Sequence, residues 1–447
     1  MLLIPKINWH KGIILFPKLS LFLVLVYILF YSQLINIANY SFLSYDANGI
    51  LRQSILFELV RYSRLLILFL IVPFLFIQKP YLKQLKYWLF VNYDIFILIG
   101  IMFLGIANAL NKQEAFFYTI WQLGSLLSVL LFIFLLIRYQ DAKNTLFFIL
   151  RFLFWSNALV LPLLFINLDT FGDSWTFKMA YTSKGAAYPY CLLSMLLAIY
   201  SSHLLCGKSI FAFKRDVLIT SVELLLIISI LFFTFFSARR TPLFIMAILS
   251  FFYLFHIVGR YYWKKVLLLG ILTIILVGSI PYLVDLMETY KYEYSILNKL
   301  ESLNSAVSGS KEDPSYSERK HIWQLYYQVF QHNPIIGTGA SNSQNFSTAL
   351  YPGHSQSGYS VHNMYVGITV EHGLLGLICF LLILIRGWWT MFKKVPIKHY
   401  INFWIFLIGP VLIINWNEYN LIPGQMFYWT TILILLLPRI YLLNGKR

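Results

Sequence analysis

The sequence predicts an all-α polytopic integral membrane protein with about twelve transmembrane helices and one long loop on the outer side. Three observations predict it: the composition, the repetition of long apolar runs, and the distribution of basic residues between them. The chain has 447 residues, of which 59% are hydrophobic and only 12% are charged. Because so few charged residues cannot cover a soluble surface of this size, most of the chain belongs in lipid.

The apolar runs are long enough to cross a bilayer, which takes about 20 residues in a helix. They recur about twelve times along the chain. The predicted spans cover residues 19–38, 55–77, 88–110, 115–137, 145–166, 186–206, 217–236, 241–259, 266–284, 364–385, 400–417 and 424–443. The run at 19–38 is not preceded by the short apolar region and small-residue cleavage site of a signal peptide, so we expect it to be retained as the first span.

Lysine and arginine residues alternate with the connections in a way that orients these spans. With the N-terminus inside, the inner connections carry 21 Lys and Arg residues and the short outer connections carry six. An excess of basic residues marks the cytoplasmic side of a membrane protein. This bias predicts that both termini lie inside, and it accounts for the net charge of +17 without a nucleic-acid partner.

The order of the runs divides the chain into four segments. The predicted segments are six N-terminal spans in residues 1–216, three spans flanking an arginine-containing turn in 217–284, a long outer loop in 285–361, and three C-terminal spans in 362–447. A loop of that length usually carries function. The three cysteines are far apart and lack metal-ligand spacing, so we expect no disulfide and no zinc site.

Local patterns predict a helix and a turn within the outer loop. Ile322, Tyr326 and Phe330 recur at i, i+4 and i+8, which is typical of a helix with one apolar stripe. Pro334 is then expected to end this helix, and the glycines that follow it predict a turn.

Basic side chains gather on the predicted outer side. Arg239 and Arg240 lie between two apolar runs, and Arg319 begins the predicted loop helix. Arginine suits a phosphate-like anion because its planar fork donates paired hydrogen bonds. The alternative is that adjacent arginines at a span end are interfacial anchors.

Five of the nine histidines also fall on this side. They are His321, His332, His354, His362 and His372. Histidine exchanges a proton near neutral pH, which suits acid–base chemistry, although a histidine at a helix mouth is often only an interfacial polar group. The spacing of these histidines fits no common metal-ligand pattern, so we expect no metal.

The start of the predicted span 364–385 is unusually polar. Asn363 stands at its mouth, and Glu371 would lie about two turns inside, where a carboxylate needs a partner or a wet cavity. His372 would point to another face, as a structural residue. Gly373 and Gly376 predict a close helix–helix contact.

Three motifs in this half of the chain resemble those of the O-antigen ligase and polymerase superfamily, membrane glycosyltransferases of the bacterial envelope. The first is His362-Asn363, nine residues and then Gly373-Leu-Leu-Gly376; the others are Ser237-Ala-Arg239-Arg240-Thr241, and Arg319 with Trp323, Pro334, Gly337 and Gly339. The resemblance covers residues 217–390. Alignment on Thr241 favours Arg240 as the equivalent of the family's arginine, whereas the family usually has Ser-Arg there.

The resemblance implies a GT-C-like enzyme with its active site facing the periplasm from a multi-pass position in the bacterial inner membrane. It implies inverting transfer of a glycan from undecaprenyl pyrophosphate with no metal and no other cofactor. Arg240 and Arg319 would hold the pyrophosphate, with Arg239 second, and His362 would activate the acceptor hydroxyl. The substrate-binding residues would be Arg239, Asn363, Trp323 and Glu371.

The acceptor separates two versions of this function. A ligase transfers the finished glycan to the lipid A-core, which we place first, and a polymerase transfers it to the next lipid-linked repeat unit. A secondary transporter or flippase is a third alternative, because four charged residues fall within early predicted spans: Arg61, Arg64, Asp94 and Arg151. The expected partners are the lipid-linked donor, one of these acceptors and membrane lipids, with no nucleic acid.

Overall fold

The computed structural model describes nine stretches of the chain. These are residues 44–45, 51–52, 79–139, 141–166, 183–211, 217–236, 240–257, 314–417 and 428–443. The predicted spans 19–38, 55–77 and 266–284 lie outside the described residues, as do Arg61, Arg64 and Arg239.

Regular structure in these stretches is helical, apart from a short antiparallel ladder between β1 (Ser44–Tyr45) and β2 (Leu51–Arg52). The helices, with short π or 3₁₀ turns labelled η, are α4 (Lys79–Val91), α5 (Tyr93–Gly105), η3 (Ile106–Asn108), α6 (Lys112–Tyr139), α7 (Ala142–Ile166), α9 (Ser183–Ser201), η4 (Ser202–Cys206), α10 (Val217–Phe236), α11 (Arg240–Ile257), α14 (Pro314–His332), α15 (Ser343–Leu350), α16 (Met364–Lys394), α17 (Ile397–Phe403), η5 (Trp404–Ile408), α18 (Gly409–Asn417), α19 (Tyr428–Leu436), η6 (Leu437–Arg439) and α20 (Ile440–Leu443).

Several of these helices are long and apolar enough to cross a membrane. Within the described residues four helices qualify, and the pair α4–α5, which is bent by 63° at its junction, makes a fifth span if it is counted as one. The protein is therefore a multi-pass membrane protein with an all-helical core. The expected total of twelve spans is not confirmed.

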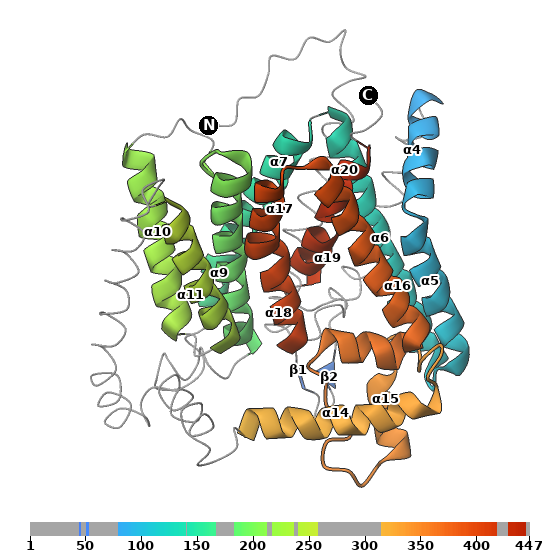
Figure 1. Ribbon diagram of the computed structural model, residues 1–447. Helices are drawn as coiled ribbons and strands as arrows, with labels where there is room; N and C mark the ends of the chain where they lie inside the picture. Colours follow the sequence, from blue (N-terminus) through green and yellow to red (C-terminus); the bar gives the residue numbers. More distant parts are fainter. Residues whose placement is uncertain are drawn as a thin grey trace, which may run out of the picture.

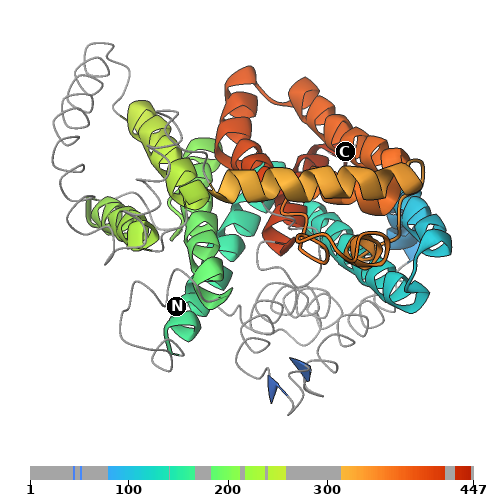
Figure 2. The same cartoon turned by 90° about the horizontal axis from the view of Figure 1, so that it is seen from below.

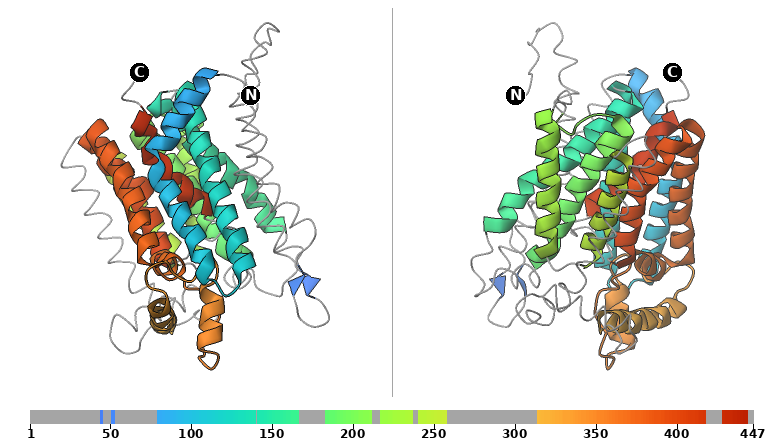
Figure 3. Two further views of the ribbon diagram at one scale, coloured as in Figure 1. Left: turned by 90° about the vertical axis from the view of Figure 1, so that its right-hand side faces the viewer. Right: turned by 60° about the vertical axis from the view of Figure 1, so that its left-hand side comes forward.

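The long helices form a bundle of roughly parallel rods; α14 lies across one end of it, and the short α15 lies at the same end (Figures 1 and 3). Seen along the bundle, α14 crosses beneath several helices (Figure 2). We call the end that carries α14 and α15 the loop end. At the opposite end Lys208 Nζ donates to Asn144 Oδ1 at 3.0 Å. Two connections that we predicted on the inner side thus lie together, away from the outer loop.

Asn342 attaches the loop to the bundle at the connection between α5 and α6. Its Oδ1 accepts a hydrogen bond from the Asn111 backbone N at 2.8 Å, and its Nδ2 donates to the Asn111 carbonyl oxygen at 3.2 Å. Nearby, Asn345 Nδ2 donates to Glu114 Oε2 at 3.0 Å. Both the oxygen and the nitrogen of the Asn342 side-chain amide therefore bond to the backbone of Asn111. This pair of bonds fixes the position of the loop end relative to the connection between α5 and α6.

The predicted loop helix and its end are confirmed. In α14 the side chains of Ile322 and Tyr326 are buried, and Phe330 is half-buried against the same small cluster. The helix ends at His332, two residues before Pro334. The turn that follows contains Gly337 and Gly339, whose φ values of 83° and 87° are both positive.

The bend between α4 and α5 is held by buried charged groups. Arg439 is 0% exposed; its Nη1 lies 3.0 Å from Asp94 Oδ1, and its guanidinium also donates to Asn92 Oδ1 at the bend itself. Arg386 Nη1 lies 3.4 Å from the same carboxylate. Because an ionised group inside a membrane requires such a partner, Asp94 has a structural role here.

The predicted uninterrupted span 364–385 is wrong at Gly373. There φ is 66° and ψ is −171°, so α16 breaks into a rim segment, residues 364–372, and a long leg, residues 374–394. In Figure 1 the rim segment lies across the loop end, whereas the long leg runs through the bundle. Glu371 consequently lies in the last turn of the rim segment, and not two turns inside a span. An apolar sequence alone could not reveal this, because glycine permits either path.

Candidate functional site

The break in α16 is closed by the turn that follows α14. The first amides of the long leg lack partners within their own helix, as all helix N-termini do. Leu374 N donates to the Pro334 carbonyl oxygen at 2.9 Å, and Leu375 N donates to the Ile335 carbonyl oxygen at 3.2 Å. The loop therefore caps the beginning of the long leg.

The same turn also caps the end of the rim segment. Thr338 N donates to the Val370 carbonyl oxygen and Gly339 N to the Glu371 carbonyl oxygen, both at 2.9 Å. Four main-chain hydrogen bonds thus join two pieces of backbone, in both directions. We call this arrangement the α16 junction.

Glycine is required at the α16 junction because the two backbones touch. A Cβ atom at Gly373 would lie 2.1 Å from the Ile335 carbonyl oxygen, and one at Gly337 would lie 2.5 Å from the Glu371 carbonyl carbon. Both glycines also have positive φ, 66° and 83°. The two glycine motifs of the sequence are therefore two halves of one structure.

Gly376 serves a different purpose from the helix contact that we predicted. A Cβ there would lie 2.2 Å from the His372 Cβ, whereas the nearest atom of α5, on Ile101, would be 3.9 Å away. Gly376 mainly makes room for His372 where the rim segment turns into the long leg.

His362 is held just before the rim segment in an uncommon backbone conformation. Its φ is 49°, in the left-handed region that few residues other than glycine adopt. Asn363 follows as the N-cap of α16, and its Oδ1 accepts hydrogen bonds from Tyr365 N at 2.9 Å and Val366 N at 3.1 Å. Since that oxygen is used by the cap, Asn363 fixes the backbone beside His362. Strained residues held in this way cluster at functional sites.

Helix α14 holds the chain that leads into His362. Trp323 Nε1 donates to the Val361 carbonyl oxygen at 3.0 Å, and the Tyr326 hydroxyl donates to the Tyr359 carbonyl oxygen at 2.6 Å. Arg319 precedes Trp323 by four residues, about 6 Å along the same helix face. The structure therefore places Arg319, Trp323 and the segment at His362 on one side of α14.

An aromatic group beside this segment was missed by the sequence reasoning. Trp416, at the end of α18, has its ring centroid 6.2 Å from that of Trp323 and 6.0 Å from that of Tyr365. Trp416 is 55% exposed. The only sequence signal was a tryptophan at the outer end of the predicted span 400–417, which is also typical of an interfacial anchor.

Glu371 has the partner that its position required. Its side chain is buried, and its Oε1 accepts a hydrogen bond from Ser343 Oγ of α15 at 2.9 Å. This bond ties α15 to the rim segment, so Glu371 holds the loop end together. The substrate-binding role that we predicted for it is not tested by this contact.

Arg240 begins α11, and its side chain is outside the described part of the structure. The Tyr253 hydroxyl, thirteen residues along α11, is hydrogen bonded to His203 Nδ1 at 2.6 Å at the end opposite the loop end. Arg240 is therefore at the loop end, with Arg319 and His362. Within the described residues no three His, Cys, Asp or Glu side chains gather as a metal site would.

Comparison with known proteins covers this region of the chain. Residues 224–381 match the model of the family described as O-Antigen ligase. The chain carries an O-antigen ligase domain. The matched residues include the start of α11, the whole of α14, His362 and the α16 junction. The superfamily resemblance inferred from the motifs is thus confirmed for this O-antigen ligase domain.

A curated relative matches over a shorter stretch. Over 91 residues the chain is 30% identical to the "Exopolysaccharide production protein ExoQ" of Rhizobium meliloti (strain 1021). The match takes in 19% of this chain and about a fifth, 21%, of the relative. It establishes a distant relationship through part of both proteins.

Proposed function

We propose that this O-antigen ligase domain protein is an inverting glycosyltransferase of the bacterial inner membrane. It takes a glycan from undecaprenyl pyrophosphate and passes it to an acceptor hydroxyl on the periplasmic face, at the loop end. The observation that carries the proposal is the position of His362: it is held at φ 49° between the Asn363 cap and the Trp323 bond, on the side of α14 that bears Arg319.

The chemistry follows from those groups. His362 accepts the proton of the acceptor hydroxyl. At the same time the oxygen of that hydroxyl bonds to the anomeric carbon, from the face opposite the leaving group. The bond from that carbon to the pyrophosphate oxygen breaks, and the electron pair leaves with the pyrophosphate. Arg319 and Arg240 stabilise the charge that develops on it, with Arg239 in support. Because the arginines neutralise the charge on the leaving pyrophosphate, the proposed reaction needs no metal ion.

The aromatic group fits the same proposal. The exposed Trp416 ring and the half-buried Tyr365 ring lie against each other beside the segment that carries His362. Large rigid aromatic surfaces suit the apolar faces of sugar rings, and they lose little conformational entropy on binding. Trp323 donates its indole N–H to the protein backbone, so only its ring is available to substrate.

Ligation to the lipid A-core is the first candidate among acceptors, and polymerisation is the second. The second is favoured by the relative whose name assigns it to exopolysaccharide production. A transporter or flippase receives less support, because the Asp94 carboxylate that suggested it is used in the pair with Arg439.

The test is a transfer assay with the purified protein in lipid nanodiscs and an undecaprenyl-pyrophosphate-linked repeat unit as donor. His362→Ala should lower the transfer rate about 100-fold or more, the scale of lost general-base catalysis, and should leave donor binding intact. His354→Ala, an exposed loop histidine, is the matched control. A near-normal rate in His362→Ala, or loss of donor binding alone, contradicts the assignment.

The anion-binding role is tested in the same assay. Arg319→Lys should lose much of the activity that Arg319→Ala loses, because lysine keeps the charge but not the paired hydrogen bonds. Full activity of Arg319→Ala at normal protein level would leave Arg319 as a membrane anchor. Offering lipid A-core and a second lipid-linked repeat unit as acceptors separates the ligase from the polymerase.

A further inference from the structure

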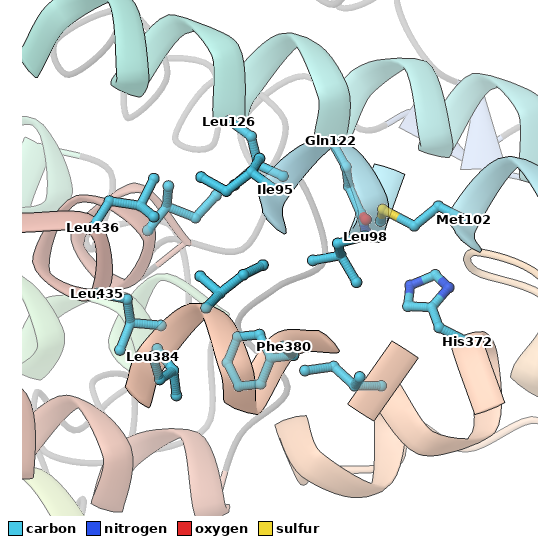
Figure 4. A pocket seen from close by; sticks show the side chains of 13 residues that line it. Ile95, Leu98, Met102, Gln122, Leu126, His372, Phe380, Leu384, Leu435 and Leu436 are labelled. Atoms are coloured by element: carbon cyan, nitrogen blue, oxygen red, sulfur yellow. The ribbon is translucent and has the colours of Figure 1, made fainter. Parts of the chain in front are cut away.

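A cavity that the proposed reaction does not use lies inside the bundle beside the long leg of α16. It is enclosed by α5, α6, α16 and α19, and its empty volume is about 660 Å³ with its open mouth included. Apart from Gln122 and His372 its lining is apolar, with Leu98, Phe380 and Leu384 among its walls (Figure 4). Such dry apolar cavities take up apolar ligands.

One end of the cavity carries the imidazole of His372. His372 is 3% exposed, and its Nδ1 has no hydrogen-bond partner among the described residues. Figure 4 shows the imidazole at the edge of the cavity, facing the space between α5 and α16. A buried polar atom without a hydrogen bond is destabilising, and Gly376 leaves the room that this placement needs.

The buried ion pair lies next to the other end of the cavity. Ile383 lines the cavity, and its carbonyl oxygen accepts a hydrogen bond from Arg439 Nη2 at 3.2 Å. From Leu374, at the start of the long leg, to Leu384, which lines the cavity, there are ten residues, or about 15 Å by helical rise. That length is close to one leaflet, half of the ~30 Å hydrocarbon layer.

We propose that this cavity binds one acyl chain of a membrane phospholipid, with the ester carbonyl oxygen accepting a hydrogen bond from His372 Nδ1. The rim segment lies across the loop end, so His372 is at the depth of the outer interface, where acyl esters lie. The chain then extends along Leu98 and Leu384 toward the ion pair.

An isoprenoid chain fits these observations less well. It has no hydrogen-bonding group except at its phosphate end. In the proposed reaction that phosphate is held by Arg319 and Arg240, across the reacting carbon from His362. His362 itself lies ten residues before His372, about 15 Å by helical rise. The Nδ1 atom of His372 would then face hydrocarbon without a hydrogen bond, so the geometry points to an ester-bearing chain.

Photocrosslinking tests the proposal with the full-length protein in nanodiscs. The probe is a phosphatidylethanolamine that carries a diazirine halfway along one acyl chain, and cross-linked peptides are identified by mass spectrometry. We expect peptides of α5 and the long leg to be labelled. Leu98→Trp should lower this labelling about tenfold by filling the cavity. Ile97→Trp, at the neighbouring residue whose side chain is 51% exposed, should not.

A second pair of variants on α16 covers the case in which Leu98→Trp fails to fold. Leu384→Phe fills the cavity, and Leu382→Phe, at a side chain that is 54% exposed, is its control. An ether-linked probe, which lacks the carbonyl, should label the cavity several-fold less than the ester probe. In His372→Phe this difference should vanish.

Equal labelling of the filled and control variants would overturn the proposal. So would equal labelling by ester and ether probes in the unmodified protein, or displacement of the ester probe by equimolar undecaprenyl phosphate, which would assign the cavity to an isoprenoid. None of these readouts depends on glycosyl transfer, so the result is independent of the proposed reaction.

Discussion

Among the described residues the bundle is broken at α4–α5 and within α16, and these two breaks are stabilised by different chemistry. Between α4 and α5 the bend of 63° is held by side chains: Arg439 contacts both Asn92 and Asp94 from more than 340 residues away. At Gly373 the break is held by four main-chain hydrogen bonds from the turn after α14. The first break depends on charge, and the second depends on the absence of side chains.

The break between α4 and α5 belongs to the packing of the bundle, whereas the break at Gly373 belongs to the candidate site. The ion pair lies inside the bundle next to the cavity, where it fixes how the helices pack. The α16 junction lies at the loop end, and it connects the helix that bears Arg319 to the rim segment that follows His362. Altering the ion pair should change stability alone, whereas altering the α16 junction should change catalysis as well.

Gly373→Ala should give the largest effect. Its Cβ would lie 2.1 Å from the Ile335 carbonyl oxygen in a backbone region essentially confined to glycine. Displacing the loop by even 1 Å can cost a site about 100-fold in rate, so we expect at least that loss in the transfer assay and a lower unfolding temperature. Gly100→Ala is the control, because a Cβ there would meet no atom of a neighbouring element within 4 Å. Normal transfer by Gly373→Ala would disprove the link between the α16 junction and the site.

Asp94→Leu should come second, with a loss of about 3–5 kcal/mol in the free energy of unfolding, because it leaves Arg439 buried without its counter-charge. The double variant Asp94→Leu with Arg439→Met should recover most of that loss. Reversible unfolding in mixed micelles measures both. The transfer rate per folded molecule should stay the same in each, and a large fall in the double variant would give the ion pair a functional role.

Thr338→Val should give the smallest effect. The Thr338 hydroxyl adds a 3.2 Å hydrogen bond to the Val370 carbonyl oxygen, which already accepts the Thr338 backbone N–H. Removing it should cost about 0.5–1.5 kcal/mol, the usual net contribution of one hydrogen bond. Unfolding and transfer should both be close to normal. A loss comparable to that of Gly373→Ala would mean that the α16 junction depends on side chains after all.

Sequence patterns predicted those features that depend on interactions between residues close together in the chain. The stripe through Ile322 and Tyr326, the helix end before Pro334 and the turn after it were all readable, because periodicity and proline act within a few residues. The bounds of α10 were also predicted residue for residue. The motif residues were found because the sequence itself places them beside the predicted outer loop.

What could not be predicted depends on contacts between distant residues. Gly373 lies in an apolar run that fits an unbroken helix equally well. The hydrogen bonds from the turn at residues 334–339 are what favour the broken helix. Trp416 and Tyr365 become neighbours of Trp323 only once α18 and α16 are packed. The partner of Asp94 lies 345 residues away, so its charge looked functional when it is structural.

The bond pair between Asn342 and Asn111 has a consequence for how the protein is made. The two residues are 231 positions apart, and chains are synthesised at about 5–20 residues per second, so Asn111 emerges roughly 10–50 s before its partner exists. During that interval the Asn111 backbone in the connection between α5 and α6 lacks the hydrogen bonds that Asn342 later provides. Translation of the outer loop, and not insertion of the last helix, is then the step at which the loop end can first assemble.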